Sequence, residues 1–119
     1  MEKTLTIDGK QIRFKHTGGT LMRYRNQFNS DFLKDFTEFA STSQENYGGF
    51  SYACIERLIW ALAKTADDSI PDPQTWFDSF EDIDIIDVWA QLGELVGEAM
   101  KPLVKSIKKA QAAGKLQNR

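Results

Sequence analysis

Cysteine and histidine are nearly absent from this 119-residue chain, which has one of each, Cys54 and His16. A single cysteine cannot form an internal disulfide, in agreement with a reducing compartment. One cysteine and one histidine also fall short of the four ligands of a zinc site, and they stand in different predicted elements, which argues against nucleophilic catalysis. We interpret Cys54 as a small core residue and His16 as a surface residue beside a turn.

Long apolar runs are also lacking. No stretch approaches the roughly 20 residues that cross a bilayer, and the first residues, MEKTLTIDGK, have no apolar segment typical of a signal peptide. The composition, 41% hydrophobic and 27% charged, is that of an ordinary globular domain. The sequence pI of about 5.4 disfavours a general nucleic-acid binder. We therefore expect a single cytoplasmic domain.

Charge is distributed unevenly along the chain. Residues 67–98 contain ten acidic side chains and no lysine or arginine, whereas residues 99–119 contain six basic side chains and no acid. Such segregation orients macromolecular partners but performs no bond chemistry by itself. This pattern favours an assembly or binding protein over an enzyme.

The start of the chain predicts a β-hairpin over about 4–15. Leu5 and Ile7 alternate with polar residues, as do Ile12 and Phe14, and Asp8-Gly9 between the two runs is a strong turn signal. Because a lone hairpin is marginal in water, its apolar face needs helices to pack against.

Apolar spacings of three and four residues predict helices over about 20–40, 52–66, 73–80 and 83–100. The first is either one bent helix or two short ones, because residues 29–31 (NSD) favour caps; we expect Thr20 to be its N-cap. Asp72 followed by Pro73 is a typical helix start. We therefore predict an α+β fold, mostly α, in which an N-terminal hairpin is followed by four to five helices.

The last predicted helix is long, and its apolar seam continues to Ala110. Pro102 interrupts that seam and predicts a kink near 98–102. We expect residues 1–101 to form one globular domain and residues 102–119 a basic helical extension that is partly frayed.

Aromatic residues are abundant, and those near the acidic block are candidates for contact with a partner if they are exposed. The candidate partner-binding residues are Trp76, Phe77, Phe80, Asp84, Asp87, Trp89, Lys105, Lys108 and Lys109. The acidic residues between 78 and 87 lack the glycine and the later glutamate of a calcium loop. We predict no catalytic residue, no metal site and no cofactor.

Several segments resemble tail assembly chaperones of long-tailed bacteriophages and prophages of Gram-positive bacteria. The resemblance covers about residues 7–95 and excludes the basic end after Lys101. The matching residues are 9–15 (GKQIRFK), Thr17, Thr20, 23–31 (RYRNQFNSD), 34–36 (KDF), 59–64 (IWALAK) and 73–77 (PQTWF).

The resemblance implies a non-enzymatic protein, mostly helical with a small hairpin, which tends to self-associate. Its expected partners are the tape measure protein, which it coats and keeps soluble, and the tail tube protein, which it recruits. It implies no catalytic or cofactor residue, and it places the protein in the cytoplasm of the bacterial host. Arg23 and Arg25 match the motif without being implied as a binding site, and we interpret Tyr24 between them as core.

Two alternatives remain open at this point. A small regulatory or nucleic-acid-binding protein could act through the basic C-terminal tail, although that tail has no aromatic residues for stacking on bases. An enzyme would need a cleft with perturbed carboxylates in the 78–87 region.

Overall fold

The computed structural model, in which residues 1–41, 52–105 and 108–109 are described, begins with a two-stranded antiparallel sheet. Strands β1 (Glu2–Ile7) and β2 (Lys10–Lys15) pair in register from Glu2 opposite Lys15 to Ile7 opposite Lys10. Asp8 and Gly9 connect them with φ of 54° and 77°, the left-handed values that this kind of tight turn requires. The hairpin predicted from the sequence is confirmed.

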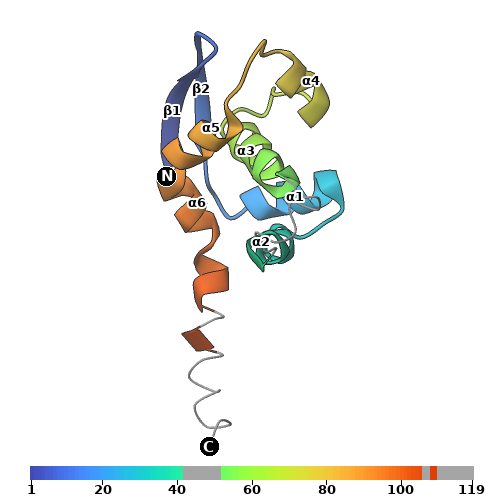
Figure 1. Ribbon diagram of the computed structural model, residues 1–119, viewed down its shortest axis with the longest axis vertical. Coiled ribbons are helices and arrows are strands. Elements are labelled where there is room, and N and C mark those ends of the chain that lie inside the picture. The colour runs from blue at the N-terminus through green and yellow to red at the C-terminus, as the bar shows by residue number, and fades with distance from the viewer. Residues whose placement is uncertain (42–51, 106–107, 110–119) are drawn as a thin grey trace, which may run out of the picture.

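Helices follow the hairpin, so the small, mostly helical α+β fold is also confirmed (Figure 1). They are α1 (Thr20–Phe28), α2 (Phe32–Ser41), α3 (Ala53–Ala66), α4 (Pro73–Asp78), α5 (Ile85–Gln91) and α6 (Gly93–Ala99), and residues 101–105 are helical as well. The described residues therefore contain more helices than the four to five that we predicted.

The predicted helix over 20–40 is two helices, α1 and α2. Asn29 ends α1 in a left-handed conformation, φ 53°, and its N–H donates to the carbonyl of Arg25. The Asp31 side chain then accepts from the N–H of Leu33 at 2.9 Å and starts α2. The prediction that Thr20 is the N-cap of this helix is wrong, because Gly19 holds that position. Thr20 is the first residue of α1 and is fully buried, and its hydroxyl accepts from the N–H of Thr17.

The predicted helix over 83–100 is also divided. Helix α5 begins after Asp84, whose side chain accepts from the N–H of Asp87, and α5 and α6 are separated at Leu92. Leu92 is fully buried, and the glycine that follows it disfavours a continuous helix. Helix α6 ends at Ala99, before Met100, and the helical residues 101–105 follow.

Helix α3 lies at the centre of the fold and contacts β2, α1, α2 and α5 (Figure 1). Its buried side chains include Leu58, Ile59 and Leu62, none of which is exposed. The hairpin contributes Phe14 and Leu5 to the same core. Because each buried aliphatic side chain of this size stabilises the fold by roughly 1.5–3 kcal/mol, packing against α3 fixes the positions of the other elements.

The hairpin turn holds the chain just after α4. The Lys10 ammonium donates to the carbonyl of Ser79 at 2.7 Å and lies 5.1 Å from the centre of the Phe80 ring. The Asp8 carboxylate accepts from the N–H of Glu81 at 3.1 Å. These contacts position α4, although they come from residues about 70 positions earlier in the chain.

The other end of α4 is held by α3 and by its own cap. The indole N–H of Trp60 donates to the carbonyl of Pro71 at 2.9 Å. Asp72 is the N-cap, as predicted, and its side chain accepts from the N–H of Thr75, with Pro73 at the first helical position. Helix α4 is therefore fixed at both ends despite its length of six residues.

We expect Leu58→Ala to lower the free energy of unfolding by about 2–5 kcal/mol, because removal of this fully buried side chain leaves a cavity in the core beside α3. Urea denaturation followed by circular dichroism measures this loss. Ile86→Ala is the matched control, since Ile86 is 49% exposed on α5 and should change the stability by less than about 0.5 kcal/mol. Equal losses in the two variants would contradict the central place of α3.

Candidate functional site

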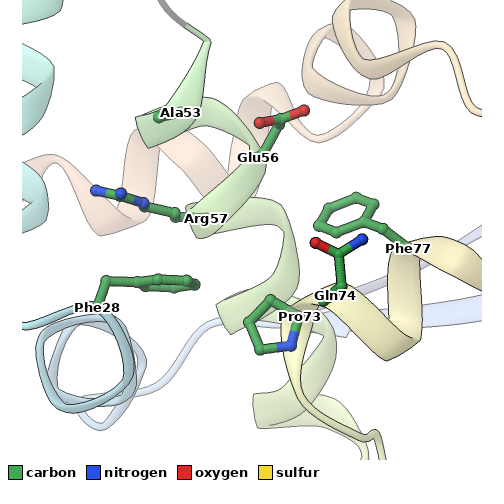
Figure 2. Close-up of a pocket in the computed structure, with 7 residues that line it drawn as sticks. All are labelled: Phe28, Ala53, Glu56, Arg57, Pro73, Gln74 and Phe77. Carbon is green, nitrogen blue, oxygen red and sulfur yellow. The ribbon is translucent and has the colours of Figure 1, made fainter.

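A groove of about 330 Å³ lies between the end of α1, the first turns of α3, and α4. Figure 2 shows the Phe28 and Phe77 rings on either side, with Pro73 and Gln74 between them in this view. The lining residues are Phe28, Ala53, Glu56, Arg57, Pro73, Gln74 and Phe77. The groove therefore combines aromatic walls with a small number of polar groups, as binding sites commonly do.

Ring contacts fix the aromatic walls. The Phe28 ring packs edge-to-face against Trp60, with 5.7 Å between the ring centres, and against Tyr24 at 5.3 Å. The Phe77 ring packs in the same way against Trp76 at 4.9 Å. Both rings are held in place by buried aromatic partners, yet each is itself partly exposed. They therefore offer a binding partner an apolar surface whose side chains are already fixed in position.

The charge of Arg57 is balanced within the protein. Its guanidinium lies 5.1 Å from the centre of the Phe28 ring and 3.7 Å from the Asp35 carboxylate. Asp35 also accepts hydrogen bonds of 2.7 Å from the Tyr24 hydroxyl and from the Ser30 hydroxyl. Burial, and then the hydrogen bond to Asp35, raise the pKa of Tyr24, which keeps its hydroxyl protonated as the donor.

The remaining charge at the groove is negative. Glu56 is exposed on α3, and no salt bridge between described residues involves it. Asp72 and Asp78, which flank the α4 residues of the groove, are exposed as well. Since Arg57 is paired with Asp35, an occupant of the groove would meet an apolar surface with acidic groups around it.

The aromatic residues predicted near the acidic block divide between core and surface. Trp76 and Phe80 are 5% and 6% exposed and pack edge-to-face at 5.2 Å, so they belong to the core in this structure. Phe77 is partly exposed and lines the groove. Trp89 is partly buried and stacks on Phe36 of α2.

The charged residues predicted for a partner lie elsewhere. Asp84 and Asp87 are exposed at the start of α5, where Asp84 serves as the N-cap. Lys105, Lys108 and Lys109 are exposed beyond α6. The structure thus does not gather the nine predicted residues into one site, and Phe77 is the member of that set that lines the groove.

Cys54 and His16, the two residues considered for nucleophilic chemistry, differ in burial. Cys54 is buried in α3, as predicted, and burial raises the pKa of its thiol to about 11, so the thiol stays protonated. His16 follows β2 directly and is partly buried, where we expected a surface residue, and its Nδ1 has no hydrogen-bond partner among the described residues. Burial lowers the pKa of His16, against an opposing effect of Glu98.

Two further findings apply to residues 1–41, 52–105 and 108–109. No group of three or more histidine, cysteine, aspartate or glutamate side chains is arranged to hold a metal ion. None of the helices within these ranges has the length and apolar character needed to cross a membrane.

Comparison with protein-family models, curated proteins and solved structures found no match to this chain. The functional argument therefore rests on the groove and on the residues of the chain itself.

We expect Cys54 to react slowly with DTNB in the native protein and rapidly in denaturing guanidinium chloride. At about pH 8 its thiolate fraction should be more than about 100-fold below that of an ordinary thiol of pKa near 8.5. Absorbance of the released thionitrobenzoate measures the rate, with N-acetylcysteine as the control thiol. Rapid labelling of the native protein would contradict the buried, protonated thiol.

His16 should make stability depend on pH. Because its folded-state pKa is lowered, the unfolded chain binds the proton more readily, and stability is lost as pH falls below about 6.5. Between about pH 7.5 and 5, urea denaturation should show a steeper loss for the wild type than for His16→Gln. The groups whose charges act on His16 are Glu98, Lys101 and the N-terminus, and they remain in both proteins. Parallel curves would contradict this assignment.

Proposed function

We propose that this protein is a tail assembly chaperone that binds and solubilises a tape measure protein during assembly of a long bacteriophage tail. We further propose that it helps to recruit tail tube subunits and is displaced as the tube grows. The proposal starts from the resemblance of residues 7–95 to this class of chaperones. It describes stoichiometric binding, without catalysis, in the bacterial cytoplasm.

The observation that carries the proposal is the ordered, partly exposed aromatic surface of the groove. A helix lays apolar side chains into such a groove, while charged groups at the rim set orientation. A volume of about 330 Å³ suits one or two apolar side chains rather than a whole helix. Binding of this kind needs no covalent step, and the partner can be released again as the tube assembles.

Two of the segments that resemble the chaperones, residues 23–31 and 73–77, contribute side chains to the lining of the groove. Residues 23–31 and 34–36 contain Tyr24, Phe28 and Asp35, which supply one aromatic wall and the carboxylate that balances Arg57. Residues 73–77 supply Pro73, Gln74 and the other aromatic wall. The resemblance and the groove therefore support the same proposal from different observations.

A small regulatory or nucleic-acid-binding protein is the second candidate, because Lys105, Lys108 and Lys109 are all exposed. Binding through these lysines to phosphates would weaken steeply as salt is raised. Absence of DNA binding at low salt would remove this candidate.

The test of the proposed function is co-expression with the tape measure protein, identified as a long helical reading frame beside the gene for this chain. The wild type should keep the tape measure protein in the soluble fraction and co-purify with it. Phe77→Ser should weaken binding roughly 30-fold, the effect of losing about 2 kcal/mol at an interface hot spot. The readouts are the soluble fraction and the amount co-purified.

Ile86→Ser is the matched control, because Ile86 is a partly exposed apolar residue of α5 outside the groove. It should retain binding, and thermal melting should show both variants folded. If the wild type neither solubilises nor co-purifies the tape measure protein, the proposed function is wrong. Equal losses in Phe77→Ser and Ile86→Ser would remove the groove as the binding site.

A further inference from the structure

A second hollow lies on the surface between α1 and α3, beside the groove. Its volume is about 220 Å³, and its lining residues are Arg23, Asn26, Gln27, Trp60 and Lys64. Two of these side chains are cationic and two are amides, and none of the described residues that line the hollow is acidic. Its chemistry therefore differs from that of the groove, which has acidic groups around it.

The groove and the second hollow adjoin at a pair of aromatic rings. Phe28 lines the groove and Trp60 lines the second hollow, and their rings pack edge-to-face with 5.7 Å between the ring centres. On α3, Glu56, Trp60 and Lys64 follow one another at intervals of four residues, which places them along one face of the helix. Glu56 lines the groove and Lys64 lines the second hollow. The two hollows thus form one surface that follows α3 for about 12 Å, the rise of eight helical residues.

Hydrogen bonds from the same face of α3 hold the segment that leads into α4. The Lys64 ammonium donates to the carbonyls of Asp68 and Ile70, both at 2.6 Å. The Trp60 indole donates to the carbonyl of Pro71 at 2.9 Å. The surface is therefore ordered before a partner arrives, which reduces the entropy that binding costs.

The two ends of this surface carry opposite charge. Glu56 is exposed on the first turns of α3, where Figure 2 shows it, and no salt bridge between described residues involves it. At the other end Arg23 is partly exposed and likewise forms no salt bridge with a described residue. Lys64 adds positive charge there, which Asp67 offsets in part. Arg23 is therefore the cation at this end that a partner would meet.

We propose that this surface binds a helical protein segment with apolar side chains at its centre, a basic residue at one end and an acidic residue about two turns away. The apolar side chains enter the groove between Phe28 and Phe77. The basic residue lies against Glu56, and the acidic residue lies against Arg23. Because these two ends are about 12 Å apart, the charged residues of the segment are about seven or eight positions apart on one face.

The inference rests on the proposed function and specifies which part of the tape measure protein this chain recognises. A long helical protein presents many apolar segments, and a requirement for one charge of each sign selects among them. A segment bound in the opposite direction would place like charges together at both ends. The charges therefore also fix the direction in which the bound segment lies across α3.

The test is isothermal titration calorimetry of the full-length protein with three synthetic peptides that are stapled to keep them helical. All three share an alanine-based sequence with two central leucines, and each carries two charged residues about eight positions apart. These are Lys and Glu in the first peptide, two Lys in the second and two Glu in the third. The wild type should bind the Lys/Glu peptide about 5-fold more tightly than either of the others, because each of those brings one like charge to one end.

Reversal of one charge in the protein should change which peptide binds best. Arg23→Glu should prefer the Lys/Lys peptide, and Glu56→Lys should prefer the Glu/Glu peptide. Arg25→Glu and Glu94→Lys are the matched controls, because they make the same changes of charge at exposed positions outside both hollows. Both controls should keep the preference of the wild type, and thermal melting should show all four variants folded.

The inference is overturned if the wild type binds the three peptides equally or binds none of them, or if the Arg23 and Glu56 variants keep its order of preference. It is also overturned if the two controls change that order as much, since net charge would then be the cause. The readout needs no tape measure protein. A chain that solubilises that protein without preferring the Lys/Glu peptide would refute this inference and leave the proposed function standing. The preference without solubilisation would do the reverse.

Discussion

Burial of α3 is the constraint on which the rest of the structure depends. From residue 54 to residue 63 this helix is apolar on nearly every face, and a helix of that kind must be covered by other elements. The hairpin, α1, α2 and α5 provide the cover. Within that stretch Glu56 and Arg57 are the positions that remain at least partly exposed, and both line the groove. The groove is thus the strip of α3 that its neighbours leave open.

How much of the fold could be predicted depends on how local each signal is. The hairpin turn at Asp8 and Gly9, and the cap at Asp72 before Pro73, are decided by a few adjacent residues, so the sequence predicts them correctly. The division between α5 and α6 falls at Leu92, which is buried in the core and is followed by Gly93. The spacing of apolar residues alone cannot show this division, because an unbroken apolar seam has the same periodicity in one helix or two.

The candidate site was much harder to predict than the fold. Phe28, Glu56 and Phe77 come from three helices, and no spacing connects them. Phe80 was a candidate for contact with a partner if exposed, yet it is buried, and the Lys10 ammonium of β2 lies over its ring, a contact between residues 70 positions apart. Asp35 lies in one of the segments that resemble the chaperones, but its role in balancing the charge of Arg57 depends on contacts among α1, α2 and α3. The sequence identified aromatic residues that could contact a partner. Which of them are accessible depends on how the helices pack.

The segregation of charge along the chain becomes a separation in space. Most of the exposed acids of residues 67–98 lie on α4, α5 and their connection, while the described lysines of residues 99–119 are exposed and lie beyond α6. The fold itself depends little on charge, because its core is apolar and ion pairs such as Arg13–Glu2 and Lys34–Glu38 are well exposed and contribute little. Salt should therefore change the stability of the fold little.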